Sequence, residues 1–235
     1  EICACLVGSE MCIRDSPYRA EKIATLCENV TVVSKTREYW TYNGTYKGVP
    51  VTIASNGCGA AGALLCFEGL ILGGAKVMIR VGTGGFLADG YKAGDMLVIT
   101  AAVREEKVME QVVPLSYPAV SNIDVTLNLQ KAAKARGVDV KTGMCVTGGI
   151  FYPELLPTNL RLFQKAGVPG YENEMSSLLV IAGLKGVKAG GIIAMDGPCF
   201  EFVGYENFDH YPDAIQTAKD QQFVIALDAL VATEI

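Results

Sequence analysis

Hydrophobic runs of two different lengths alternate along the chain. Short apolar or alternating runs are typical of strands, and longer stretches with helical spacing lie between them. The expected strands span 30–34, a hairpin at 38–55 with its turn at Asn43-Gly44, 76–82, 96–103, 138–147 and 187–195. The expected helices span 18–28, 59–73, 121–136, 172–186 and 212–233. This alternation predicts a three-layer α/β/α fold built on a central, mixed, twisted sheet.

The first sixteen residues do not follow this pattern. The segment EICACLVGSEMCIRDS is rich in cysteine and has no hydrophobic period after Val7. We therefore expect residues 1–16 to be a non-native or disordered segment, and residues 17–235 to form one domain. A chain of 235 residues lies within the size range of a single large α/β domain.

Composition and charge narrow the class of ligand. The formal net charge is -5, with only 20 lysines and arginines and no basic block, so the surface that a nucleic-acid-binding protein needs is missing. No apolar segment approaches the roughly 20 residues that cross a bilayer. The chain has eight cysteines but one histidine, without zinc-ligand spacing, so we expect reduced thiols and no metal site. We expect a cytoplasmic protein that binds a small molecule.

Small residues and arginines follow one of the expected strands. In MIRVGTGGF, the strand carries Arg80 into a loop that contains Gly82 and Thr83. Ligands of open α/β sheets bind outside the carboxyl ends of strands, and backbone N–H, hydroxyl and guanidinium groups together suit a phosphate. Arg19 opens a helix after Pro17 and could face the same anion. The alternatives are a tight turn whose arginine pairs with a carboxylate, and a solvated surface arginine at 19.

Carboxylates stand at two further junctions of the predicted elements. Glu172 and Glu174 precede a helical pattern, and on an extended segment they would face the same side, as binding of the two vicinal hydroxyls of a ribose requires. The alternative is that they complement the dipole of the helix. Asp196 ends the apolar run GGIIAM, where loss of hydration could raise its pKa into the range of a general acid. The alternative is an aspartate that hydrogen-bonds its own turn.

Taken in order, these stretches resemble the hexameric type of the nucleoside phosphorylase family, and in particular the purine nucleoside phosphorylases of apicomplexans. The resemblance covers roughly residues 17 to 233 and rests on PYRAEKI, TREYWTY, CFEGLILGGAKVMIRVGTGG, GDMLVITAAVREE, YENEMSSLL and GGIIAMDG. It implies reversible phosphorolysis of purine nucleosides to a free base and (deoxy)ribose 1-phosphate. The implied enzyme is a homo-oligomer, a trimer of dimers, with inorganic phosphate as co-substrate and no cofactor.

Uridine phosphorolysis, hydrolysis by a nucleosidase and non-catalytic nucleoside binding stay open as alternatives. The resemblance implies that phosphate contacts come from Arg19, Arg80, Gly82 and Thr83, with Arg37 reaching into a neighbouring subunit. It assigns ribose contacts to Glu172, Asn173 and Glu174, and base contacts to Phe151, Asp196 and Phe202. Asp196 is the implied catalytic residue, hydrogen-bonded to purine N7.

The sequence also departs from the family's pattern. The first phosphate loop of the family reads Gly-Asp-Pro-Gly-Arg, but residues 15–19 here are DSPYR, so the close backbone approach that the first glycine allows is lost. The N-terminal histidine that relatives lend to the ribose 5′-hydroxyl has no counterpart, and Asn173 replaces a methionine. Glu201 and Phe202 occupy the region where bacterial relatives carry a supporting arginine, and we interpret His210 as a surface residue near the site.

Overall fold

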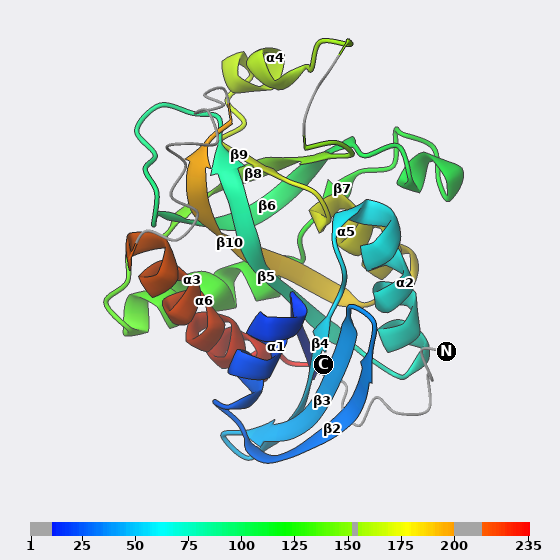
Figure 1. Cartoon of the computed structure of the whole chain (residues 1–235), viewed down its shortest axis with the longest axis vertical. Helices are drawn as coiled ribbons and strands as arrows, with labels where there is room; N and C mark the ends of the chain where they lie inside the picture. The colour runs from blue at the N-terminus through cyan, green and yellow to red at the C-terminus, as the bar shows by residue number, and fades with distance from the viewer. Residues whose placement is uncertain (1–10, 152–154, 200–212) are drawn as a thin grey trace.

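The computed structural model describes residues 11–151, 155–199 and 213–235 (Figure 1). The described strands are β1 (Met11–Asp15), β2 (Glu28–Thr36), β3 (Tyr39–Tyr46), β4 (Val49–Ser55), β5 (Val77–Phe86), β6 (Met96–Glu105), β7 (Ala119–Val120), β8 (Lys141–Gly148), β9 (Gly170–Glu172) and β10 (Lys188–Pro198). The described helices are α1 (Pro17–Ala24), α2 (Gly59–Leu72), the 3₁₀ turn η2 (Met109–Gln111), α3 (Ile123–Ala135), α4 (Leu160–Lys165), α5 (Met175–Leu184) and α6 (Asp213–Val231). The expected α/β class is confirmed.

The strands form one mixed sheet that partly closes on itself. β5 pairs in parallel with β10, β10 pairs antiparallel with β6, and β6 pairs in parallel with β8. The short strand β9 then joins β8 back to the end of β5 and completes a ring. The sequence did not predict this closure, because three residues carry no readable period and the helix expected at 172–186 begins on the last of them.

The helices cover the sheet in two layers, with α1, α3 and α6 on one side and α2 and α5 on the other (Figure 1). Ile23, Leu129 and Phe223 are fully buried in the first layer, and Phe67 and Leu178 in the second. Each such side chain contributes about 1.5–3 kcal/mol by leaving water. The two layers therefore fix the strands between them and the loops at the strand ends. No helix within the described ranges is both long enough and apolar enough to span a bilayer.

The described structure begins earlier than the domain boundary expected at residue 17. Residues 11–15 form β1, which lies in the interior of the sheet between β4 and β5 and runs parallel to both. Five residues of the segment expected to be non-native or disordered therefore form a strand, because a short central strand takes its stability from two neighbours rather than from its own pattern. That the segment is non-native stays a prediction.

The expected hairpin turn at Asn43-Gly44 is wrong. Both residues lie inside β3, and the turn to β4 is at Lys47-Gly48, which have φ angles of 50° and 79°. Two positive φ angles are typical of the two-residue turns that join twisted strands. Packing accounts for the glycine at position 44 instead, because a Cβ there would lie only 3.1 Å from the Cβ of Cys27.

Candidate active site

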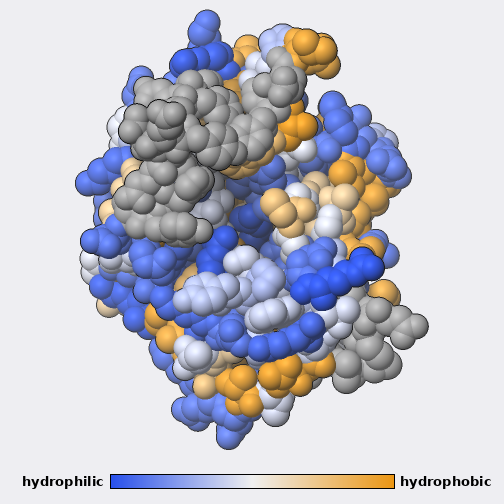
Figure 2. All heavy atoms as spheres, viewed as in Figure 1, coloured by the Kyte–Doolittle hydropathy of each residue, from blue (hydrophilic) through white to orange (hydrophobic). Residues whose placement is uncertain are grey.

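The candidate site lies where β5 and β10 end side by side. Thr83 is opposite Ala194, and the register then shifts so that Asp196 is an extra residue in β10. Such a bulge bends the strand and re-aims its side chain. Figure 2 shows a hollow with hydrophilic walls near the middle of this face of the molecule.

Arg80 is buried at the heart of this edge, with 5% of its surface exposed. Its Nη2 forms a close ion pair with Oε2 of Glu174 and lies 3.4 Å from Oε2 of Glu172. The guanidinium folds back over Gly82, where a Cβ would lie 2.5 Å from Nη1. Arg80 therefore pairs with a carboxylate, as the alternative interpretation of this residue expected. A guanidinium has five N–H donors, so this pairing and an anion contact are compatible.

Gly82→Ala tests whether this room for the guanidinium matters. The added methyl group would displace Arg80, and we expect the KM for phosphate to rise by about 10-fold, the effect of one to two kcal/mol of overpacking. Steady-state kinetics with varied phosphate would measure it. Gly62→Ala is the matched control, because its Cβ would meet its nearest neighbour at an ordinary 3.7 Å. An unchanged phosphate KM in Gly82→Ala would contradict the expectation.

Glu174 joins three elements at one carboxylate. Its Oε1 accepts a hydrogen bond of 2.5 Å from the backbone N–H of Gly59, the first residue of α2, while Oε2 pairs with Arg80 on β5. Glu174 itself occupies the N-cap position of α5. Asn173, beside it, is half-buried. This carboxylate is therefore held at the edge of the sheet next to the predicted phosphate residues.

Glu172 is turned toward protein donors. Its Oε2 accepts the backbone N–H groups of Glu174 and Met175 at 2.7 Å each, and its Oε1 accepts the Thr147 hydroxyl at 2.5 Å. Burial raises the pKa of Glu172 above its ordinary value, while the charge of Arg80 opposes that rise. Glu172 thus caps the beginning of α5, as the helix-dipole alternative expected. Its contact with ribose stays a prediction.

Asp196 lies among the predicted phosphate residues. Burial raises its pKa, and its own backbone N–H, the charge of Lys219, a hydrogen bond with Thr83 and the charge of Arg19 oppose the rise. The Nε of Arg19 donates to Ser16 Oγ at 3.0 Å, just past the end of β1. The structure therefore brings Asp196, Thr83 and Arg19 together at the edge that holds Arg80.

Two residues at this edge were not identified as site residues from the sequence. Lys219 stands on α6, in a run without any chemical motif, and nothing in the pattern indicated its proximity to Asp196. Thr147 is the penultimate residue of β8 and hydrogen-bonds Glu172. The rule that ligands gather at strand ends could have found Thr147, since it is the last residue of the strand expected at 138–147.

Two of the remaining predicted residues are exposed in the described structure. Phe151 is 66% exposed, and Arg37 is exposed in the turn between β2 and β3, with a φ of 52°. An exposed Arg37 is compatible with a contact to another subunit. Phe202, Glu201 and His210 lie outside the described residues.

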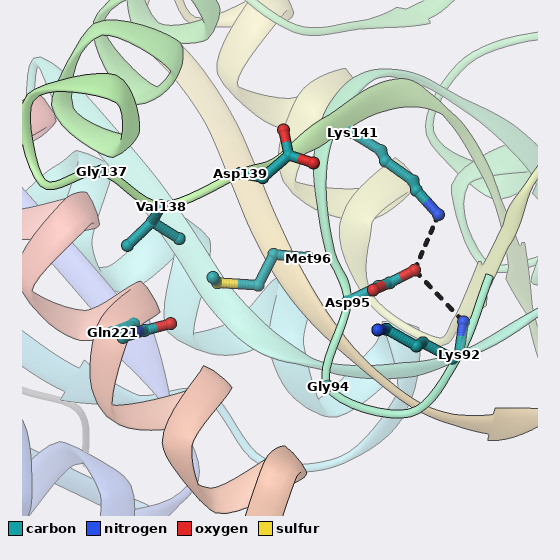
Figure 3. A pocket seen from close by; sticks show the side chains of 9 residues that line it. All are labelled: Lys92, Gly94, Asp95, Met96, Gly137, Val138, Asp139, Lys141 and Gln221. Atoms are coloured by element: carbon teal, nitrogen blue, oxygen red, sulfur yellow. Dashed lines mark hydrogen bonds and ion pairs between the residues drawn. The ribbon is translucent and has the colours of Figure 1, made fainter.

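A cavity of about 350 Å³ lies beside the candidate site (Figure 3). On one wall, Asp95 accepts hydrogen bonds from Nζ of Lys141 at 2.7 Å and from the backbone N–H of Lys92 at 3.2 Å. Gln221 on α6 lines the opposite wall. The backbone of Asp95 also accepts a hydrogen bond from Met195, the residue before Asp196. None of the predicted site residues within the described ranges lines this cavity, but its wall supports the strand that carries Asp196.

Comparison with known proteins assigns the fold to a family. The model of the phosphorylase superfamily matches residues 11–231. A purine nucleoside phosphorylase from Plasmodium falciparum is 38% identical over 188 residues, covering 79% of this chain and 77% of the relative. A uridine phosphorylase from Haemophilus influenzae is 34% identical and covers 74% of each chain. The crystal structure of purine nucleoside phosphorylase from Toxoplasma gondii in complex with immucillin-H superposes with a TM-score of 0.88 at 32% identity, covering 93% of this chain and 88% of that one.

Proposed function

The chain belongs to the phosphorylase superfamily, and we propose that it catalyses the reversible phosphorolysis of purine nucleosides. The observation that carries the proposal is the ion pair between Arg80 and Glu174 at the strand edge where β10 also carries Asp196. One edge of the sheet thus holds three groups with complementary roles. They are the Arg80 guanidinium for phosphate, the Glu174 carboxylate for vicinal hydroxyls and the partly buried Asp196 carboxyl for a purine ring. Relatives named purine nucleoside phosphorylase, from Plasmodium and Toxoplasma, support the choice of substrate.

In the proposed reaction, the bond between the sugar C1′ and the base breaks as a phosphate oxygen bonds to C1′. The bonding electrons leave with the base, and Asp196 gives or shares a proton at purine N7. Positive charge that develops on the sugar is stabilised by phosphate, held by Arg80, Arg19 and the hydroxyl of Thr83. Glu174 accepts hydrogen bonds from the ribose hydroxyls. Positioning of the reactants supplies much of the rate, because phosphate and sugar meet at neighbouring side chains.

Uridine phosphorolysis and hydrolysis are the rival reactions. Uridine phosphorylases are also relatives of this chain, but Asp196 suits a purine because N7 is an acceptor that needs a proton. A nucleosidase uses water instead of phosphate and has no need of the two arginines at 19 and 80. A non-catalytic nucleoside-binding protein would bind the nucleoside without forming product.

A product assay separates these possibilities. The purified protein is incubated with inosine, guanosine, adenosine or uridine, each with and without phosphate, and the free base is quantified. We expect base release from a purine nucleoside only when phosphate is present. Equal release without phosphate would favour a nucleosidase, preference for uridine would favour the pyrimidine enzyme, and binding without release would favour a non-catalytic role.

We also propose that the enzyme works in the cytoplasm as a homo-oligomer, a trimer of dimers, without metal, cofactor, nucleic acid or membrane. The exposed position of Arg37 supports a site completed by a neighbouring subunit. Mass measurement of the native assembly tests this proposal. A fully active monomer would contradict it.

Lys219→Met is expected to extend activity to higher pH. Burial raises the pKa of Asp196 and the positive charge of Lys219 opposes that rise, so removing the charge should raise the pKa further. The protonated, proton-donating form of Asp196 then persists at higher pH, and the alkaline limb of kcat/KM should shift upward. Lys131→Met, an exposed lysine on α3, is the control and should leave the profile unchanged. An alkaline limb in Lys219→Met that stays in place or moves to lower pH would contradict this sign.

A further inference from the structure

Thr147, at the end of β8, is fully buried beside the carboxylates of the candidate site. Its hydroxyl donates to Glu172 Oε1 at 2.5 Å and accepts the backbone N–H of Ser176 at 2.9 Å. Both hydrogen-bonding functions of the hydroxyl are therefore used, one on a charged group and one on the first turn of α5. A hydrogen bond to a buried charged group is among the stronger ones in a protein.

Glu172 passes this restraint on to the residues proposed to bind substrate. Its second oxygen accepts the N–H groups of Glu174 and Met175 at 2.7 Å each, and lies 3.4 Å from Nη2 of Arg80. The same Arg80 nitrogen pairs with Glu174. A rotation of the Glu172 carboxylate would therefore free the start of α5 and change the partner of Arg80.

We propose that Thr147 is a positioning residue, which sets the spacing of Arg80 and Glu174 by holding Glu172 in place. The inference rests on the proposed phosphorolysis. Its physical basis is competition, since two buried carboxylates share one guanidinium. The hydroxyl of Thr147 and the N–H groups of α5 stabilise the charge on Glu172, so Arg80 can remain with Glu174. Without the hydroxyl, Glu172 draws Arg80 toward itself or takes up a proton.

The groups that face Glu172 determine how its protonation responds to pH. Arg80 faces it from β5, Glu174 from the beginning of α5, and the thiol of Cys145 from β8 at 3.8 Å. Burial raises the pKa of Cys145 well above its ordinary value, so the thiol stays neutral. Loss of the Thr147 donor removes a contact that favours charged Glu172. Glu172 would then take up its proton at a higher pH, and the acid limb of kcat/KM should move to higher pH.

Thr147→Val and Thr147→Ser test the inference, with the wild-type enzyme and Thr142→Val measured in parallel. Valine keeps the shape of the threonine side chain without its hydroxyl, whereas serine keeps the hydroxyl. Thr142, which lies exposed on the same strand, is the site of the control variant. In Thr147→Val we expect kcat/KM for inosine to fall by about 10-fold to 100-fold through higher KM for phosphate and nucleoside, the effect of a lost hydrogen bond to a charged group. The acid limb should shift upward. Thr147→Ser should keep kcat/KM within about 3-fold of the wild-type value, because the hydrogen bond to the charged group is retained.

The outcomes separate the two proposals. An active wild type whose KM values and acid limb are unchanged in Thr147→Val, or a Thr147→Ser as impaired as the valine variant, overturns the positioning role alone. A wild type without phosphorolysis overturns both proposals. If Thr147→Val does not fold, Glu172→Gln serves instead, because it keeps the side-chain shape but removes the charge. It should raise both KM values, because an amide nitrogen in place of Oε2 cannot accept the N–H groups of Glu174 and Met175 and the start of α5 is released. It should also abolish the acid limb, and wild-type KM values in Glu172→Gln would overturn the inference.

Discussion

Arg80→Met is expected to abolish phosphorolysis and to lower the free energy of unfolding by about 3–5 kcal/mol, the usual cost of removing one partner from a buried ion pair. The guanidinium is the group proposed to bind phosphate, and it is also the countercharge of two buried carboxylates. Both losses therefore follow from one substitution. Activity is measured by base release from inosine, and stability by denaturant unfolding.

Two further variants separate binding from stability. Arg80→Lys keeps the charge but loses the forked geometry, so it should retain more of the stability than of the phosphate affinity. Arg80→Met combined with Glu174→Gln removes one of the stranded charges and should recover part of the stability without any activity. A stable Arg80→Met enzyme with wild-type phosphate kinetics would contradict both the ion pair and the phosphate role.

Asp196→Ala is expected to lower kcat for inosine by about 10²–10⁴-fold, the usual contribution of a general acid. Little stability should be lost, because Asp196 is only partly buried and stands in a bulge at the end of β10. Single-turnover base release measures the chemical step, and thermal unfolding tests the fold. Asp89→Asn, an exposed aspartate in the loop after β5, is the matched control. Unchanged inosine turnover in Asp196→Ala would exclude Asp196 as the catalytic residue and weaken the assignment to purines.

The parts of the site that could be predicted are those at the ends of long strands. β5 and β10 begin as apolar runs, so the amino-acid pattern alone locates Arg80, Thr83 and Asp196 at one edge of the sheet. The expected loop at Gly82 and Thr83 is wrong, because β5 continues through both residues to Phe86 by pairing with β10. The pair at 172 and 174 was identified from its place before a helical pattern, and both carboxylates are buried beside Arg80. Regular hydrophobic periods also predicted the helices at 59–73 and 121–136 to within a few residues of α2 and α3.

The features that could not be predicted depend on contacts between distant segments. Residues 170–172 become a strand only because the ends of β5 and β8 lie on either side of them. Glu172 caps α5 because Thr147, from another strand, accepts and donates in the right directions. Lys219 comes near Asp196 through the packing of α6 on the sheet. No local hydrophobic period or secondary-structure propensity encodes these contacts, because each depends on the topology of the whole fold.

The central claim is that phosphate held at Arg80 attacks the sugar. It is tested most directly by ³¹P NMR of inosine cleavage in phosphate buffer, with hypoxanthine followed in the same sample. We predict a sugar phosphate signal that grows in step with hypoxanthine in the wild-type enzyme and is absent from Arg80→Met. Hypoxanthine that accumulates without any sugar phosphate would contradict the claim.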